Sequence, residues 1–124
     1  MQPVLSVLLV DDDEGIRDSV AECLLSEGYA VSAVANGAEA LAALRTTERP
    51  GVLLVDLIMP VMDGAELIDA LRADPALRRI PVVLMTAASA TAGLPPADDY
   101  LEKPFQLEDL LATVERHVRP AAAA

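Results

Sequence analysis

The sequence predicts an α/β fold in which a parallel β-sheet is covered by helices on both faces. Short, almost wholly apolar runs, such as VLLV at residues 52–55, recur along the chain. Such runs are typical of strands buried on both sides, because no polar residues alternate with the apolar ones. Between them lie stretches with apolar residues at helical spacing, the order expected of parallel strands joined by crossover helices. The length of 124 residues and the hydrophobic fraction of 53% suit one domain with its own core.

The first part of the chain contains two strands and one helix of this pattern. Residues 4–10 (VLSVLLV) are predicted to form the first strand and residues 29–34 the second. A helix between them is predicted to end at Gly28, since a glycine just past a helix readily takes the left-handed conformation. Its apolar positions recur at helical spacing: Ile16, Val20, Cys23, Leu24 and Leu25.

The middle of the chain continues the alternation. After an Asn-Gly turn at residues 36–37, residues 38–45 are predicted to form a helix with its two leucines, Leu41 and Leu44, facing inward. Residues 52–55 form the third predicted strand. Asp63 and Gly64 open the next helix, which the Asp74-Pro75 pair ends.

The last part of the chain supplies two more strands and a helix. Residues 81–85 and 99–101 are the predicted strands, and residues 106–118 are the predicted helix. The apolar face of that helix is expected to consist of Leu107, Leu110, Leu111 and Val114. We expect one domain over residues 1–119, with residues 120–124 forming a linker stub or a disordered tail.

Charge and composition argue against several classes of function. The formal net charge of −11 disfavours direct binding of nucleic acid by this chain, which would need clustered cations. No apolar run approaches the roughly 18 residues that a membrane span needs. The single cysteine, Cys23, cannot form an internal disulfide, so we expect a reducing, cytoplasmic setting. Eight of the nine basic residues are arginine, and the one lysine is Lys103.

Polar side chains follow four of the five predicted strands at the point where each strand ends. Asp11 and Asp12 follow the first strand, and Asp56 ends the third. Thr86 ends the fourth strand and Lys103 follows the fifth. Because ligands of open parallel sheets bind beyond the carboxyl ends of the strands, these residues predict one site rather than scattered surface groups.

The residue types in this site point to phosphoryl transfer. Three converging carboxylates raise one another's pKa values unless a cation lies among them, and an all-oxygen ligand set suits Mg²⁺. Lys103 offers a compact positive charge and Thr86 a hydroxyl donor. With these groups in place, Asp56 can act as the nucleophile and form an aspartyl phosphate.

Each of these residues alone has a simpler interpretation. The acidic run at 11–14 could be a solvated cap of the first helix, and Asp13 and Glu14 are expected to have that role. Tyr100 alone would be a core residue with its hydroxyl at the surface, and His117 is expected to be exposed. The arrival of polar groups from four separate connections favours the site.

Four segments resemble the signature segments of bacterial response-regulator receiver domains. They read VLLVDDDEGIR, LLVDLIMPVMDG, VVLMTA and DYLEKPF, and they occur in the order that the family has. The resemblance covers nearly the whole chain and so identifies residues 1–119 as a receiver domain. It implies a flavodoxin-like three-layer sandwich, with a five-stranded parallel sheet in the order 2-1-3-4-5.

The resemblance also implies a role for each site residue. Asp56 would accept a phosphoryl group, with Lys103 and Thr86 contacting its oxygens. Tyr100 takes the position of the family's switch aromatic, and the bond between Lys103 and Pro104 would be cis. The magnesium site would consist of Asp12, Asp56 and the carbonyl of Ile58, with Asp11 acting mostly through water.

The function implied is that of a phosphoacceptor switch in a two-component phosphorelay, not a turnover enzyme. The donor would be a sensor histidine kinase or a histidine phosphotransfer protein, and the output a downstream target protein or a fused output domain. We expect a monomer or weak dimer that does not bind membranes. Two alternatives stay open at this point: a receiver-like interaction module that acts without phosphorylation, and a metal-dependent phosphatase-like enzyme. The second lacks an acid at Ile58, where a D-x-D motif would have one.

The span between Thr86 and Lys103 is shorter than the family's usual span. It contains Gly93, Pro95 and Pro96, which oppose a regular helix. We therefore expect the fourth helix to be shortened or missing. Such a change would alter a face through which many members of the family signal, and it would leave the chemistry of the site unchanged.

Overall fold

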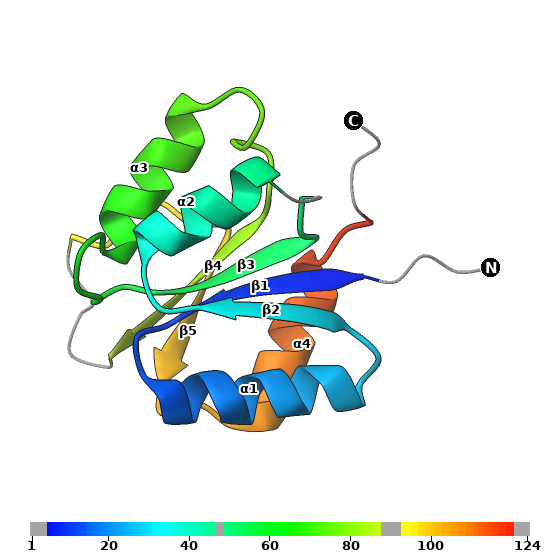
Figure 1. Cartoon of the computed structure of the whole chain (residues 1–124). Coiled ribbons are helices and arrows are strands. Elements are labelled where there is room, and N and C mark those ends of the chain that lie inside the picture. The colour runs from blue at the N-terminus through cyan, green and yellow to red at the C-terminus, as the bar shows by residue number, and fades with distance from the viewer. Residues whose placement is uncertain (1–4, 47–48, 88–92, 121–124) are drawn as a thin grey trace.

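The computed structural model describes residues 5–46, 49–87 and 93–120. Strands and helices alternate along most of the chain, as the apolar pattern predicts (Figure 1). In chain order the elements are β1 (Ser6–Val10), α1 (Glu14–Ser26), β2 (Ala30–Val34), α2 (Gly37–Thr46), β3 (Val52–Asp56), α3 (Gly64–Ala73), β4 (Val82–Ala87), β5 (Asp99–Lys103) and α4 (Leu107–His117).

The five strands form one parallel sheet in the order β2-β1-β3-β4-β5, which confirms the predicted topology. Helices α1 and α4 cover one face, and α2 and α3 cover the other, so the molecule has three layers (Figure 1). The order reverses at β1 and β3, which are neighbours in the centre of the sheet. In open α/β sheets the crevice beyond such a reversal is where ligands bind.

The central strands feed two separate cores by simple alternation of their side chains. In β3, Leu53 and Val55 pack with the α2 and α3 side, whereas Val52 and Leu54 pack with the α1 and α4 side. Because successive strand residues point to opposite faces, an unbroken apolar run is what a strand with two buried faces requires. The result is a β3 backbone held between two cores and two neighbouring strands.

Helix ends lie where the sequence predicts them. Asp13 caps α1 by accepting a hydrogen bond from the Ile16 amide, and Gly28, just past that helix, has a φ of 93°. Asp63 and Glu66 form a reciprocal capping box at the start of α3. These local signals set the starts of the two helices that follow the central strands.

The connection between β4 and β5 carries no helix in its described part, residues 93–98. The expected shortening of the fourth helix is confirmed there, while residues 88–92 lie outside the described residues. Leu94 and Ala97 pack against the core on the α2 and α3 side, and Asp98 accepts a hydrogen bond of 2.7 Å from the Val82 amide. These few contacts therefore hold residues 93–98 against the core in place of a helix.

Some details differ from the predictions. Leu25 and Leu107, expected on the apolar faces of α1 and α4, are about half exposed, because each helix turns a narrower face inward. The fifth strand runs on to Lys103, so this residue ends the strand and does not follow it. Most of the predicted tail lies outside the described residues. Within the described part, no helix has the length and apolar character needed to cross a membrane.

Candidate functional site

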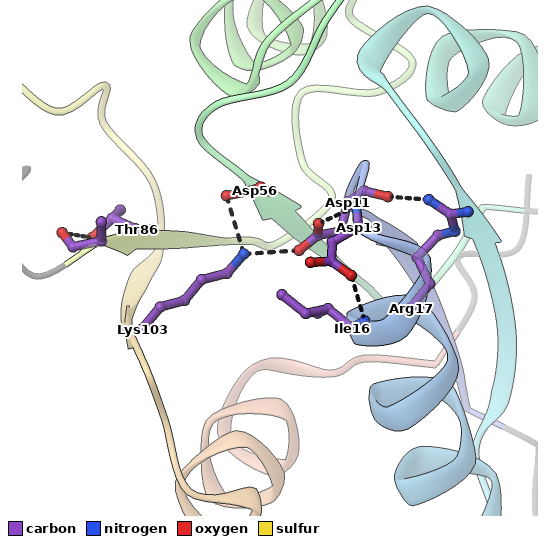
Figure 2. Close-up of polar contacts among 8 residues, drawn as sticks. Asp11, Asp13, Ile16, Arg17, Asp56, Thr86 and Lys103 are labelled. Carbon is purple, nitrogen blue, oxygen red and sulfur yellow. Dashed lines mark hydrogen bonds and ion pairs between the residues drawn. The ribbon is translucent and has the colours of Figure 1, made fainter.

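The carboxyl ends of β1, β3 and β5 bring three carboxylates and one ammonium group together (Figure 2). Asp11 and Asp12 follow β1, Asp56 is the last residue of β3, and Lys103 is the last residue of β5. One oxygen from each of the three aspartates lies within 4.8 Å of the others. The structure therefore gathers four residues that the sequence predicted to share a site.

Asp11 is the best-held residue of this group. It is fully buried, and all four of its polar atoms are hydrogen-bonded. Its amide donates to the Val34 carbonyl at 3.1 Å, and its carbonyl accepts from Arg17 Nη1 at 2.8 Å. Its carboxylate oxygens accept from the Asp13 amide at 2.9 Å and from Lys103 Nζ at 3.0 Å. A buried charge with this set of partners is fixed in one geometry.

Arg17 is a residue of this site that the sequence analysis missed. It lies in the first turn of α1, and its guanidinium donates to the carbonyl of Asp11 (Figure 2). A signal was available, because a cation in the first turn of a helix opposes the helix dipole and so indicates a local partner. Arg17 fixes the backbone from which the Asp11 and Asp12 side chains project.

Asp56 and Lys103 face each other across the site. Lys103 Nζ lies 3.4 Å from Asp56 Oδ1 as well as 3.0 Å from Asp11 Oδ2. Burial and the charge of Asp11 raise the pKa of the Asp56 carboxyl, and Lys103 only partly offsets them. Burial lowers the pKa of the Lys103 ammonium, but its bond to Asp11 and the nearby carboxylate charges outweigh this and raise it. Lys103 is therefore a permanent cation in an acidic cluster.

The donor set fits a magnesium ion. Three ionised carboxylates and one ammonium leave two negative charges uncompensated, which equals the charge that one divalent cation neutralises. Two oxygens bound to one Mg²⁺ lie at most about 4.2 Å apart, so the present spread allows some carboxylates to bind directly and another through water. Asp12 is exposed and able to turn toward an ion, whereas both oxygens of Asp11 already have partners.

Thr86 lies at the end of β4, next to the site, and its hydroxyl is directed away from it. Its Oγ1 donates to the carbonyl of Ala87 at 3.4 Å, and Figure 2 shows the pair on the far side of Lys103 from Asp11. The side chain is buried. The structure thus brings Thr86 to the predicted edge of the sheet, and its contact with a phosphoryl group stays a prediction.

Tyr100 on β5 is tied to the connection that replaces the fourth helix. Its hydroxyl donates to the Pro95 carbonyl at 2.8 Å and accepts from the Ala97 amide at 3.1 Å. Tyr100 as a whole is 43% exposed. The switch residue that the family resemblance implies therefore holds the 95–97 segment through its one polar atom.

The remaining site predictions fall near the cluster. The peptide bond between Lys103 and Pro104 is cis, as the resemblance implies. Ile58, two residues past Asp56, has an exposed side chain, and the role of its carbonyl as a metal ligand stays a prediction. A groove of about 660 Å³ opens beside the cluster between α1 and the β5–α4 connection, with Ile16, Phe105 and Lys103 among its lining residues.

The expectation that His117 is exposed is wrong. His117 Nε2 lies 2.8 Å from Asp99 Oδ2, and Arg116 donates to the same oxygen at 2.8 Å. Burial raises the pKa of Asp99, but the bonds from His117 and the Tyr100 amide, with the charges of His117 and Arg116, hold it below its ordinary value. These contacts join α4 to β5, and helical periodicity could not reveal them because the acid lies on another element.

Comparisons with known proteins agree with this geometry. Response regulator MprA of Mycobacterium bovis (strain BCG / Pasteur 1173P2) is 39% identical over 126 residues, covering 95% of this chain and 54% of that protein. This chain therefore spans about half the length of that relative.

Solved receiver domains share the fold. The signal receiver domain of a signal transduction histidine kinase from Syntrophus aciditrophicus has 34% identity and a TM-score of 0.85, covering 91% of this chain and 89% of that one. The receiver domain of sensor histidine kinase PA1611 from Pseudomonas aeruginosa PAO1, solved with a magnesium ion coordinated in its active site cleft, has 29% identity and a TM-score of 0.84, covering 92% of this chain and 97% of that one. The family model of the response regulator receiver domain matches residues 7–115. The chain belongs to the response regulator receiver domain family.

Proposed function

We propose that this chain is a phosphoacceptor switch in which Asp56 takes a phosphoryl group from a phosphohistidine. One observation carries the proposal: the Asp56 carboxylate ends a buried central strand 3.4 Å from a lysine that is held by a second, fully buried carboxylate. This arrangement fixes a nucleophile, a cation and a set of metal ligands at one point of the sheet.

In the transfer step, a carboxylate oxygen of Asp56 forms a bond to phosphorus as the bond from phosphorus to the donor imidazole nitrogen breaks. The electron pair of the broken bond stays on that nitrogen, which then takes up a proton. Lys103 lies where it can contact an oxygen of the phosphoryl group in flight, and Asp11 holds it there.

The acidic cluster supports a requirement for Mg²⁺. Asp12 and Asp56, with the carbonyl of Ile58, would hold the ion, and Asp11 would reach it through water. When bound, the ion would neutralise the charge that gathers on the phosphoryl oxygens. Without a cation, the like charges of Asp11 and Asp12 disfavour an anionic phosphoryl donor near Asp56.

The response would pass through Thr86 and Tyr100. Among the described residues, the Thr86 hydroxyl makes one long bond, to the Ala87 carbonyl, and it would give up this bond on turning toward a phosphorylated Asp56. Tyr100 on β5 pairs with Leu84, two residues before Thr86 on β4, and a shift there would act on the 95–97 segment through two hydrogen bonds. The signal would be a change in affinity for a partner.

A sensor histidine kinase or a histidine phosphotransfer protein would supply the phosphoryl group in the cytoplasm. The groove beside Lys103, with its apolar residues Ile16 and Phe105, offers such a donor a surface close to the acceptor. The output would be a separate target protein or a fused output domain. We expect a monomer or weak dimer that does not itself contact nucleic acid.

The test is the intact mass of the chain after incubation with a small acyl phosphate, with and without Mg²⁺. We expect one phosphoryl adduct that requires Mg²⁺ and is absent in Asp56→Asn. As a matched control, Asp69→Asn on the exposed face of α3 should be labelled like the wild type. No adduct with either the acyl phosphate or a phosphorylated kinase would overturn the proposal and favour an interaction module that works without phosphorylation.

A further inference from the structure

A second charged pocket lies at the opposite edge of the sheet, far along the strands from the aspartates. Its lining residues include Arg49, Arg79 and Arg119. The first two belong to the connections that lead into β3 and β4, so the pocket lies at the amino ends of these strands, whereas Asp56 lies at the carboxyl end (Figure 1). Three of the eight arginines of an acidic chain thus line one cavity of about 250 Å³.

These three arginines differ from three of the other six basic residues in having no carboxylate partner among the described residues. Arg72 and Arg116 pair with aspartates, and Lys103 pairs with two. In residues 5–46, 49–87 and 93–120, no carboxylate lies within ion-pair distance of Arg49, Arg79 or Arg119. Arg49 is half-buried, and Arg79 and Arg119 are exposed. Three positive charges around one cavity without a carboxylate partner in the described residues favour an anion there.

Arg49 also lacks a hydrogen-bond partner for one of its side-chain nitrogens. Its Nε is buried and has no hydrogen-bond partner, the one buried side-chain nitrogen or oxygen in the described residues of which this is true. A buried donor without an acceptor is costly, and more so when the group is charged. The missing partner is an acceptor, and an oxyanion in the cavity supplies one when the Arg49 side chain turns its buried Nε toward it.

The pocket is built by tight packing of the backbone. The Arg119 amide donates to the Gly51 carbonyl at 3.1 Å, and a Cβ on Gly51 would overlap the carbonyl oxygen of Arg119. Only a glycine at position 51 lets the segment after α4 lie against the connection into β3. That close approach brings Arg119 to the same pocket as Arg49, and Pro50, Pro75 and Pro81 stiffen its walls.

We propose that this pocket binds the phosphate group of a small molecule. Each guanidinium carries five N–H donors in a planar fork that matches phosphate oxygens in pairs. A single carboxylate has too few oxygens and too little charge to satisfy three such groups. The cavity volume of about 250 Å³ is several times the roughly 30 Å³ that one water molecule takes up in the liquid. The cavity therefore has room for a phosphomonoester as well as for the free phosphate ion.

The proposal is independent of phosphorylation at Asp56. A bound phosphate would touch the connections into β3 and β4 and the segment after α4 at once. It would therefore stabilise the folded chain and hold the segment at Arg119 against the sheet. Asp56→Asn should bind phosphate as the wild type does, so failure of one proposal leaves the other standing.

The test is a titration of the chain, labelled with ¹⁵N in its arginine side chains and backbone, with inorganic phosphate. Chloride keeps the ionic strength constant and a chelator removes Mg²⁺. We expect saturable shifts of the Arg49 Nε–H and the Gly51 amide, the former assigned by its loss in Arg49→Gln. Arg79→Gln should weaken binding about tenfold or more, the loss expected for a charge-assisted hydrogen bond.

The control is Arg78→Gln, which removes the same charge from the neighbouring residue. The side chain of Arg78 is exposed, as that of Arg79 is, but it does not line the pocket. This substitution should change the affinity by less than about twofold, as for an exposed charge. Equal losses in the two variants, or shifts that never saturate, would reduce the effect to general charge attraction and overturn the proposal. If the natural ligand is a phosphate ester, glycerol phosphate should bind at least as tightly as inorganic phosphate. If the natural ligand is the free phosphate ion, glycerol phosphate should bind less tightly. Succinate binding as tightly as either would overturn the assignment to phosphate.

Discussion

The end of β3 and the connection between β4 and β5 are held by opposite means. The first lies at the carboxyl end of the sheet, and the second runs back to the amino ends of β4 and β5. Val52 to Val55 are fully buried, and Asp56 follows them with β1 and β4 on either side. The described part of the connection, residues 93–98, is held by two partly buried apolar side chains and by hydrogen bonds from Tyr100 and Asp98.

This difference in packing suits the two regions to different roles. A backbone fixed by burial on two faces cannot shift without disturbing both cores, which suits a nucleophile that must stay near Lys103. A segment held by a few polar contacts can be released for a small free energy. Under the proposed function, the phosphoryl chemistry would take place in the rigid region, and the connection would be the part that responds to it.

The largest expected effect comes from crowding the rigid region. A Cβ on Gly64 would lie 2.6 Å from the Asp56 carbonyl oxygen and 3.0 Å from Leu57 Cα, and both are backbone atoms. Gly64→Ala should lower the free energy of unfolding by about 1–3 kcal/mol, as overpacking does. Urea denaturation followed by circular dichroism measures this. A Cβ on Gly15 would meet only Asp13 Oδ1, the side-chain atom that caps α1, at 3.2 Å. A small shift of that side chain relieves the contact and alanine favours the helix, so Gly15→Ala should change the free energy of unfolding by less than about 1 kcal/mol. Equal losses in the two variants would mean that β3 is not the more constrained region.

A smaller effect, with the opposite sign, comes from removing charge at the same place. Since the pKa of Asp56 is raised by burial and by Asp11, its ionised form opposes folding. This cost is absent below the ordinary pKa of an aspartate and grows as the pH rises through the raised pKa. In the absence of Mg²⁺ at neutral pH, Asp56→Asn should therefore melt a few degrees above the wild type.

The advantage of Asp56→Asn should shrink as the pH falls below the raised pKa of Asp56. It should vanish below the ordinary pKa of an aspartate, where Asp56 is protonated in both the folded and the unfolded chain. Mg²⁺ should raise the melting temperature of the wild type far more than that of the variant, because it relieves the same repulsion. Asp69→Asn, on the exposed face of α3, is the matched control. A variant less stable than the wild type without Mg²⁺ would contradict the charge balance described for the cluster.

The smallest effect tests the polar connection. Tyr100→Phe removes the hydroxyl that bonds Pro95 and Ala97, and should cost below about 1 kcal/mol because the ring is partly exposed. Hydrogen exchange of the amides at 97–98 should quicken, while the Asp13 amide, bonded to buried Asp11, keeps its protection. Tyr29→Phe is the control, since no hydrogen bond of its hydroxyl occurs within the described residues. Faster exchange at Asp13 in Tyr100→Phe would mean that the two regions are one unit.

The sequence predicted most of the fold because its signals are local. An apolar run such as 52–55 predicts a strand from its own composition, and the Asp63 cap and Gly28 set helix ends through neighbouring residues. The site followed from one topological rule, since residues at the carboxyl ends of parallel strands share an edge. Arg17 and the pair of His117 with Asp99 were missed, because their partners lie in a connecting loop or on another element.

The sequence by itself thus determined which strands exist, which residues stand at their ends and which family the segments resemble. Only the tertiary structure decided that Asp11, and not its exposed neighbour Asp12, is the buried partner of Lys103. It alone decided that Tyr100 holds the 95–97 segment and that Arg49, Arg79 and Arg119 share a pocket. The physical reason is distance along the chain: periodicity and capping act over a few residues, whereas charge pairing and packing depend on where separate elements meet in space.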